Sequence, residues 1–366
     1  MQPTNTTDVR TRLASILAGN GSSLDIRGLP AEEVLTCSRA EGVSALLASR
    51  MEPNGGTANG MHAELHRFAR SLAASELAQR AELRRVLTAL ARAGIPVLVL
   101  KGHALGQWLY PAPYLRECSD IDLMFADRAQ AEDAASTLDA LGYATPYRPG
   151  QHSHEMLCRR QGAQVDLDIH WALAAMPAWN RLPGFHRLFA DAVHLPGLGD
   201  SAKGLDPAHA LLHACVHRAS NLGAGLGDRL KWLYDIHLLA TGFTGEQWGV
   251  FLRACHDARI SGLALSGLHA SRAMLATSLP VHSLEHLERD AVHDALDATR
   301  LADWRYVQRR NLAALDGLEA QARWLWGQVF PATGYMRELY GSQQSWSGLM
   351  LQRVKRLRAR LMSRAD

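Results

Sequence analysis

The sequence predicts an α+β protein, in which a small mixed β-sheet with flanking helices is followed by a large, all-helical C-terminal region. Short apolar runs of strand length fall between residues 95 and 171, helical periodicity surrounds them, and strand patterns stop after about residue 205. With 366 residues, 47% of them hydrophobic, the chain is long enough for two or three packed units. We expect an N-terminal helical segment over 1–60, a sheet-containing core over 61–204 and a helical domain over 205–366.

Charge and cysteine content narrow the classes of function. The 39 basic and 36 acidic residues give a net charge of +3, too balanced for a protein that coats nucleic acid. Five cysteines form no CxxC pair, so neither a disulfide framework nor a zinc knuckle is expected. Residues 1–10 lack the order of a signal peptide, and no apolar run approaches the roughly 20 residues of a transmembrane helix. We expect a soluble, cytoplasmic protein with reduced thiols.

The first part of the core region alternates helix, strand and helix. Residues 53–56 (Pro-Asn-Gly-Gly) indicate a loop and a boundary, and Met61–Ala93 has the apolar spacing of one or two amphipathic helices. Ile95–Leu100 is a continuous apolar run, typical of a buried strand. It stops at a Lys-Gly pair, after which His103–Tyr110 has a helical pattern.

Two further strands are expected downstream. Ser119–Phe125 and Val165–Trp171 both alternate with period two, and between them Arg128–Leu141 has the pattern of a helix that ends at Gly142. Beyond residue 205 we expect helices that include 211–217, 230–240 and 248–257.

An acidic pair on the second expected strand is the sharpest chemical feature. Asp120 and Asp122 are two positions apart, so their side chains point to the same face and could hold one or two hard cations. Two carboxylates forced together repel each other, and Mg²⁺ would relieve that repulsion. The alternative is that they are solvated acids at a strand end, and the pair alone does not decide between the two interpretations.

The surroundings of the pair strengthen the metal interpretation. Gly102 ends an apolar strand and opens a helix, which places backbone N–H groups where phosphates could bind. A two-metal site needs a third carboxylate. Asp166 and Asp168 both lie on the third expected strand and share one face, so periodicity does not choose between them.

These motifs resemble the uncharacterised nucleotidyltransferase branch of the DNA polymerase β-type superfamily. The resemblance is strongest over roughly residues 95–175 and continues, more faintly, toward the C-terminus. The matching residues are Leu100-Lys101-Gly102, Tyr110, Arg116, Asp120-Ile121-Asp122-Leu123, Asp168-Ile169-His170-Trp171, Ala210-Leu211-Leu212-His213, His217, Leu230-Lys231-Trp232-Leu233-Tyr234-Asp235-Ile236, Phe330-Pro331, Tyr335 and Arg337.

The resemblance implies a nucleotidyltransferase core over 61–204 that uses a nucleoside triphosphate, such as ATP, and two Mg²⁺ ions. Asp120 and Asp122 would bind the metal and the phosphates, and the resemblance favours Asp168 as the third ligand, which would activate the acceptor hydroxyl. A nucleoside monophosphate would pass to a protein, peptide, RNA or small molecule. The nucleotide, the acceptor and the oligomeric state are not readable from the sequence.

One departure from the superfamily leaves alternatives open. The usual glycine-serine signature is replaced by Lys101-Gly102, so the phosphate contact of the serine is missing. Lys101 could supply a cation instead, and Arg116 could hold a phosphate oxygen with its planar fork, or both could be solvated strand-end charges. Two other functions remain compatible: kinase-like phosphoryl transfer to a peptide or small molecule, and a catalytically inactive nucleotide- or partner-binding module.

Four weaker features have simpler interpretations. His213 and His217 have helical metal-ligand spacing but are better explained as core or surface histidines, and Asp235 is placed to pair with Lys231 four residues earlier. His170 could orient Asp168, contact substrate or simply pack in its strand. The tail Leu349–Arg364 predicts a basic amphipathic helix that packs its leucines on the core, with contact to an acidic partner as the alternative.

Overall fold

The computed structural model describes residues 6–21, 26, 28–51, 60–147, 149–150, 154–163, 165–224, 226–341 and 344–362. The loop expected at residues 53–56 and the last tail residue, Arg364, lie outside these ranges.

A mixed sheet of seven strands is present in the described part of the chain, in the order β3-β4-β5-β2-β1-β7-β6. Strands β2 and β5 run parallel, as do β1 and β7, and the other neighbours are antiparallel. The strands are β1 Leu98–Val99, β2 Asp120–Met124, β3 Tyr143–Ala144, β4 Glu155–Arg160, β5 Asp166–His170, β6 Val193–His194 and β7 Lys203–Gly204.

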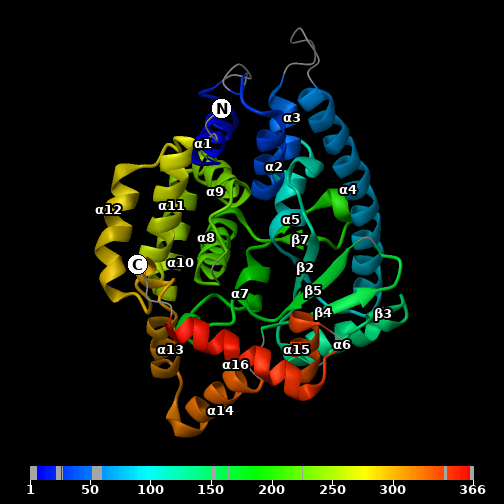
Figure 1. The fold of residues 1–366 in the computed structure, drawn as a ribbon, viewed down its shortest axis with the longest axis vertical. Helices are drawn as coiled ribbons and strands as arrows, with labels where there is room; N and C mark the ends of the chain where they lie inside the picture. The colour runs from blue at the N-terminus through cyan, green and yellow to red at the C-terminus, as the bar shows by residue number, and fades with distance from the viewer. Residues whose placement is uncertain are drawn as a thin grey trace.

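Helices surround this sheet and fill the rest of the molecule, so the expected α+β class is confirmed (Figure 1). The helices are α1 Thr6–Leu17, α2 Ala31–Glu41, α3 Ser44–Arg50, α4 Gly60–Arg92, α5 Lys101–Trp108, α6 Arg128–Asp139, α7 Phe185–Ala190, α8 Pro207–Gly223, α9 Leu230–Gly242, α10 Gly245–Ala258, α11 Ser261–Leu275, α12 Val281–Asp290, α13 Trp304–Ala313, α14 Gly317–Val329, α15 Thr333–Tyr340 and α16 Trp346–Met362.

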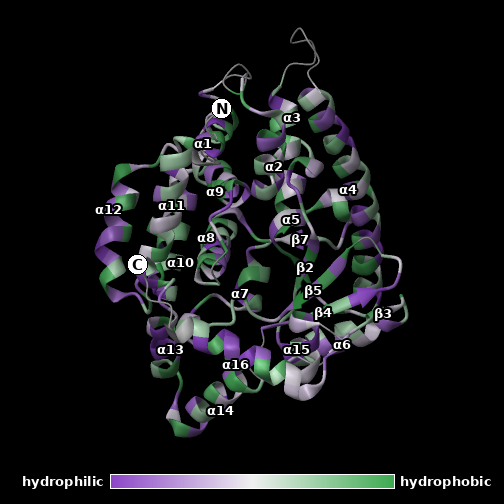
Figure 2. Ribbon diagram, in the orientation of Figure 1, coloured by the Kyte–Doolittle hydropathy of each residue, from purple (hydrophilic) through white to green (hydrophobic). Residues whose placement is uncertain are grey.

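One face of the sheet is buried under α4 and α6. Ile121 and Leu123 on β2 pack in the same apolar cluster as Leu87 of α4 and Ala134 of α6. Green and purple residues intermix along α4, as expected for an amphipathic helix that covers a sheet (Figure 2). Because side chains alternate along a strand, the even-numbered residues of β2 face the opposite side of the sheet.

A second apolar cluster joins the N-terminal helices to those beyond residue 205. Leu13 of α1 and Leu47 of α3 share it with Leu211 of α8 and Leu268 of α11. Segments far apart in the sequence therefore pack together, and the three-part division of the chain remains a prediction.

Most expected elements occur, with shifted bounds. Met61–Ala93 forms part of one long helix, α4, while the strand expected over Ile95–Leu100 is only two residues long. Helix α5 begins at Lys101, which has a φ of 49°, instead of at His103. Strands β3, β4, β6 and β7 were not expected, because three of them have two residues and cannot show a period.

The basic tail forms helix α16, and only part of its apolar face is covered. Leu349 is buried, but Leu351 and Val354 remain exposed. Arg353 is buried and donates through Nε to the carbonyl oxygen of Gln328 at 2.9 Å. None of the helices within the described ranges combines the length and apolar character needed to cross a membrane.

Candidate active site

The parallel pairing of β2 with β5 brings acidic residues from separate chain segments together. In this register Asp120 lies beside Asp166 and Asp122 lies beside Asp168. All four side chains belong to the face opposite α4 and α6, because the intervening residues of both strands are buried in the core on the other side.

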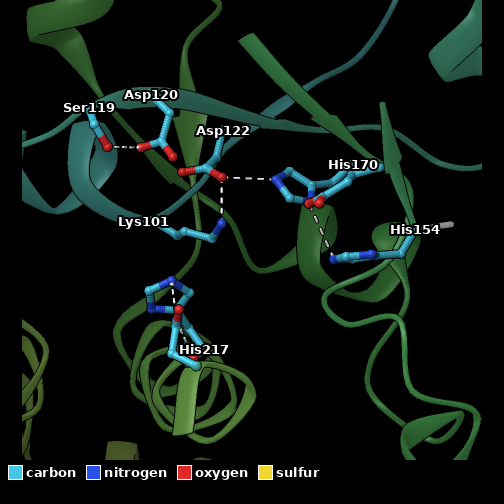
Figure 3. A network of polar contacts seen from close by, with 9 residues as sticks. Lys101, Ser119, Asp120, Asp122, His154, His170 and His217 are labelled. Carbon is cyan, nitrogen blue, oxygen red and sulfur yellow. Dashed lines mark hydrogen bonds and ion pairs between the residues drawn. The ribbon is translucent and has the colours of Figure 1, made fainter. Parts of the chain in front are cut away.

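Asp122 is the centre of this cluster. It is 3% exposed, and one of its oxygens, Oδ1, lies 2.5 Å from Nζ of Lys101 and 2.9 Å from Nε2 of His170 (Figure 3). Burial disfavours its charge, but Lys101 and His170 outweigh burial and hold the pKa of Asp122 well below its ordinary value. Asp122 is therefore an ionised carboxylate inside the protein.

Asp120 and Asp168 lie beside the negative charge of Asp122, and among the residues described neither has partners like Lys101 and His170 to stabilise a charge of its own. Burial and the charge of Asp122 raise the pKa of Asp120, and the same causes, together with Glu155, raise the pKa of Asp168 to about 7. Asp168 makes no hydrogen bond or ion pair to other described residues, and Asp120 only accepts from Ser119 Oγ at 3.3 Å.

The structure distinguishes the two acids of β5 that the sequence left equivalent. Asp166 accepts from the guanidinium of Arg159, at 2.9 Å to Nη2. Asp168 instead joins Asp122 and His170 in a group whose potential ligand atoms all lie within 4.8 Å of one another. Asp120 shares the face, but it is outside the two such groups found among the described residues.

This donor set fits Mg²⁺ chemically. Mg²⁺ prefers carboxylate oxygens, and burial together with the charge of Asp122 raises the pKa of both Asp120 and Asp168, which a bound cation would reverse. Oδ2 of Asp122 and the carboxyl groups of Asp120 and Asp168 could hold the ion, whereas Oδ1 of Asp122 is engaged by Lys101 and His170.

A pocket of about 160 Å³ opens beside Asp120 and Asp122. It is lined by all three residues expected to bind phosphate, Lys101, Gly102 and Arg116, and also by a cationic and aromatic segment at the start of α9. The further lining residues are Glu117, Cys118, Ser119, His217, Asn221, Arg229, Lys231 and Trp232.

Arg229 and Lys231 were not expected in the site. Burial, followed by the charge of Arg116, lowers the pKa of Lys231, which makes no ion pair with any described residue. Lys231 belongs to the Leu-Lys-Trp motif that resembles the family. It lies more than a hundred residues after Asp120, however, so the sequence did not indicate that the two residues meet in the fold.

Arg116 is less available to a ligand than expected. It is buried, and its Nε and Nη2 each donate at 2.8 Å to opposite oxygens of Asp235, which also accepts from the Tyr110 hydroxyl at 2.6 Å. The expected pairing of Asp235 with Lys231 is therefore wrong, and Arg116 is not a solvated charge. Its Nη1 donates to the carbonyl of Glu117, on the pocket side.

Gly102 is required by packing as well as by its place in the pocket. A Cβ on this residue would lie 2.3 Å from Sγ of Cys118 and 3.3 Å from Nη1 of Arg116. Only glycine lets the start of α5 approach these side chains, so the turn brings the Lys101 ammonium to Asp122.

Two of the three histidines of α8, His213 and His217, lie beside the site. His213 is buried, and His217 lies in the pocket with Nε2 3.1 Å from the amide nitrogen of Asn221. Burial and Lys101 lower the pKa of His217 to about 3, so its ring is neutral. Neither belongs to a metal-ligand group in the described part of the chain.

Glu155, which begins β4, and His154, which immediately precedes it, are two residues near the site that the sequence interpretation missed. Nδ1 of His170 lies 3.2 Å from Oε2 of Glu155, and Nε2 of His154 lies 3.4 Å from the same atom. In the strand, buried Met156 and Cys158 alternate with more exposed neighbours, but Leu157 between them is also apolar, so the sequence shows no clear period of two here.

An α+β fold with clustered carboxylates beside a cationic pocket is suited to phosphate chemistry. A family model described as uncharacterised nucleotidyltransferase matches residues 28–276, well over half of the chain. The chain therefore belongs to this family, as its motifs indicated, and is by membership a transferase that acts on nucleotides. No curated protein matches the chain.

Proposed function

We propose that the protein transfers a nucleoside monophosphate from a nucleoside triphosphate to an acceptor hydroxyl, in a reaction that requires Mg²⁺. The observation that carries the proposal is the register of β2 with β5, which sets Asp122 beside Asp168. Asp122 is an ionised carboxylate that lines the pocket together with Lys101, Arg229 and Lys231. Its strand neighbour Asp168 has a pKa raised to about 7 by burial and by the charge of Asp122.

The three acids have different proposed roles. Asp120, Asp122 and Asp168 would hold Mg²⁺, which when bound neutralises phosphate charge and orients the triphosphate. Asp168 would also accept the proton of the acceptor hydroxyl, since it lies beside Asp122 and makes no hydrogen bond or ion pair to a described residue that would occupy its carboxylate. The hydroxyl oxygen bonds to the α-phosphorus while the bond to the bridging oxygen breaks, and pyrophosphate leaves with that electron pair.

Lys231 and Arg229 are the proposed anchors of the phosphates. They line the same pocket as Asp120 and Asp122, so the triphosphate would bind there, in contact with both the metal and these cations. Lys231 is half-buried and makes no ion pair with any described residue, and a phosphate would supply the missing opposite charge. The ring of Trp232, which lies against the Arg229 guanidinium, lines the same pocket.

Binding is tested first by thermal stabilisation of the full chain with each of the four nucleoside triphosphates. A ligand that binds only the folded state raises the unfolding temperature. We expect at least one nucleotide to stabilise the protein with MgCl₂ but not with EDTA. The effect should vanish in the Asp120→Asn, Asp122→Asn double variant and persist in Glu132→Gln, a change at the exposed end of an α6 ion pair.

The reaction type is tested with that nucleotide labelled at the α- or γ-phosphorus, incubated with candidate proteins, peptides, RNA and small molecules. Transfer of the α-label with release of pyrophosphate supports the proposal. Transfer of the γ-label would replace it with phosphoryl transfer. Nucleotide binding that does not depend on Mg²⁺, with no transfer of either label, would identify an inactive binding module instead.

A further inference from the structure

Three potential metal ligands of mixed type meet beside the proposed magnesium site. They are Nε2 of His154, an oxygen of Glu155 and Nδ1 of His170, and all three atoms lie within 4.8 Å of one another. Glu155 begins β4 and His154 immediately precedes it, whereas His170 ends β5, the strand that pairs with β4. Figure 3 shows His154 and His170 on the side of Asp122 away from Asp120.

We propose that His154, Glu155 and His170 form a site for a transition-metal dication such as Zn²⁺, separate from the Mg²⁺ site. Two imidazoles and one carboxylate are the ligands of a borderline-soft cation, whereas Mg²⁺ selects oxygen. This inference goes beyond the proposed transferase function and does not depend on it.

The distances fit tetrahedral coordination. Ligands about 2.0–2.1 Å from a central Zn²⁺ are separated from each other by about 3.3 Å along a tetrahedral edge. Oε2 of Glu155 lies 3.2 Å from Nδ1 of His170 and 3.4 Å from Nε2 of His154. Two edges of the tetrahedron therefore match, and the third, between the two histidines, is no longer than 4.8 Å.

The second nitrogen of His170 has the partner that metal-bound histidines usually have. Its Nε2 lies 2.9 Å from Oδ1 of Asp122, so an Nε2–H donated to that carboxylate leaves the Nδ1 lone pair for the metal.

The site is reached from a large pocket of about 690 Å³. His154 and Glu155 line this pocket together with Trp326 of α14, Phe330 just after it and Tyr335 of α15. Three protein ligands leave a fourth tetrahedral position for water or another ligand from the pocket, as in zinc sites that are not closed by protein alone.

Cobalt binding tests the site, because Co²⁺ replaces Zn²⁺ and absorbs visible light when tetrahedral. The full chain, stripped with EDTA and held in excess MgCl₂, is titrated with CoCl₂ and then with ZnCl₂. We expect visible absorption that saturates at one Co²⁺ per chain and is lost on addition of one Zn²⁺. His154→Gln should weaken cobalt binding at least about tenfold, and Glu155→Gln serves as a second variant if the first does not fold.

Two controls separate this site from other possibilities. His186→Gln, at an exposed histidine of α7, should bind Co²⁺ like the wild type. Asp120→Asn should also keep the cobalt spectrum, even though it removes a proposed Mg²⁺ ligand. Absence of visible absorption at stoichiometric Co²⁺, or an unchanged affinity in folded His154→Gln or Glu155→Gln protein, would overturn the proposal and leave a hydrogen-bonded network.

Discussion

Nε2 of His170 and Nζ of Lys101 both contact Oδ1 of Asp122, from residues 48 positions after it and 21 before it. One buried carboxylate therefore joins the end of β5 and the start of α5 to β2. Because its charge is compensated by protein groups, Asp122 stabilises the fold as well as taking part in the proposed site. Asp120, on the same strand, lacks such partners.

The first prediction contrasts these two neighbours. Asp122→Asn should lower the free energy of unfolding by about 3 kcal/mol, because it leaves the Lys101 ammonium largely buried without its counter-charge. Asp120→Asn should leave stability within about 0.5 kcal/mol of wild type or raise it, since it relieves repulsion. Urea unfolding of both variants gives the comparison.

The two variants should differ in stability but not in activity. Both substitutions should reduce nucleotidyl transfer by about a hundredfold or more, since each removes a charge from the proposed metal site. An Asp120→Asn variant as unstable as Asp122→Asn would contradict the assignment of different roles.

The pH dependence of stability should report Asp168. Burial, with the charges of Asp122 and Glu155, raises its pKa to about 7, against about 3.9 in the unfolded chain. The fold thus favours the protonated form: the stabilisation is complete below about pH 4 and is lost as the pH rises through about 7. Without metal, the unfolding temperature should fall between pH 5 and pH 8, and MgCl₂ should remove much of that fall.

Asp168→Asn should flatten this pH profile. The matched variant is Asp166→Asn, which changes the neighbouring acid of β5 that pairs with Arg159 at the surface and should leave the slope intact. A slope that survives Asp168→Asn but disappears in Asp166→Asn would assign the third carboxylate to Asp166 instead.

Local pattern was enough to place the acids on strands. The alternation around Asp120 and Asp122, and around Asp168, predicted β2 and β5 and the shared face of each pair. The choice between Asp166 and Asp168 depends on the register of β2 with β5, which lie more than forty residues apart, and on the ion pair between Arg159 of β4 and Asp166. The sequence pattern of a single strand contains neither piece of information.

Residues brought to the site from a distance were not predictable in the same way. Lys231 reaches the pocket because α9 packs on α8, and its stem passes Gly42, where a Cβ would lie 2.5 Å from Cδ of Lys231. Arg116 looked like a free cation because its partner Asp235 is 119 positions away. Periodicity reports which face of an element is buried, but not which charges meet across the core.

The third prediction concerns the proposed phosphate anchor. Lys231→Met keeps the aliphatic stem but removes the ammonium, so affinity for the stabilising nucleoside triphosphate should fall about tenfold, the loss of one charged contact. Calorimetric titration measures it. Lys355→Met, at an exposed position of α16, is the matched control and should bind like wild type. Equal affinities for both variants would place the triphosphate elsewhere.

The buried ion pair of Arg116 should be a major contribution to stability. Asp235→Ala leaves a buried guanidinium and the Tyr110 hydroxyl without their acceptor and should cost about 3–5 kcal/mol. Glu132→Ala breaks the exposed pair with Arg128 and should cost less than about 1 kcal/mol. If chemical denaturation gives similar values for both, Arg116 is not held by Asp235 in solution and its fork is available to phosphate.

The last prediction tests why Gly102 follows Lys101. Gly102→Ala should destabilise the protein and reduce nucleotide affinity, because the new Cβ would lie 2.3 Å from Sγ of Cys118 and displace the start of α5 with Lys101. Adding Cys118→Ala removes that sulfur atom and should recover most of the lost unfolding free energy. Calorimetric unfolding of the single and double variants measures the coupling between the two sites. If Cys118→Ala restores stability but not nucleotide binding, the Gly102 backbone contacts the bound nucleotide. If Cys118→Ala restores neither, the close contact with Cys118 is not the reason that this position requires glycine.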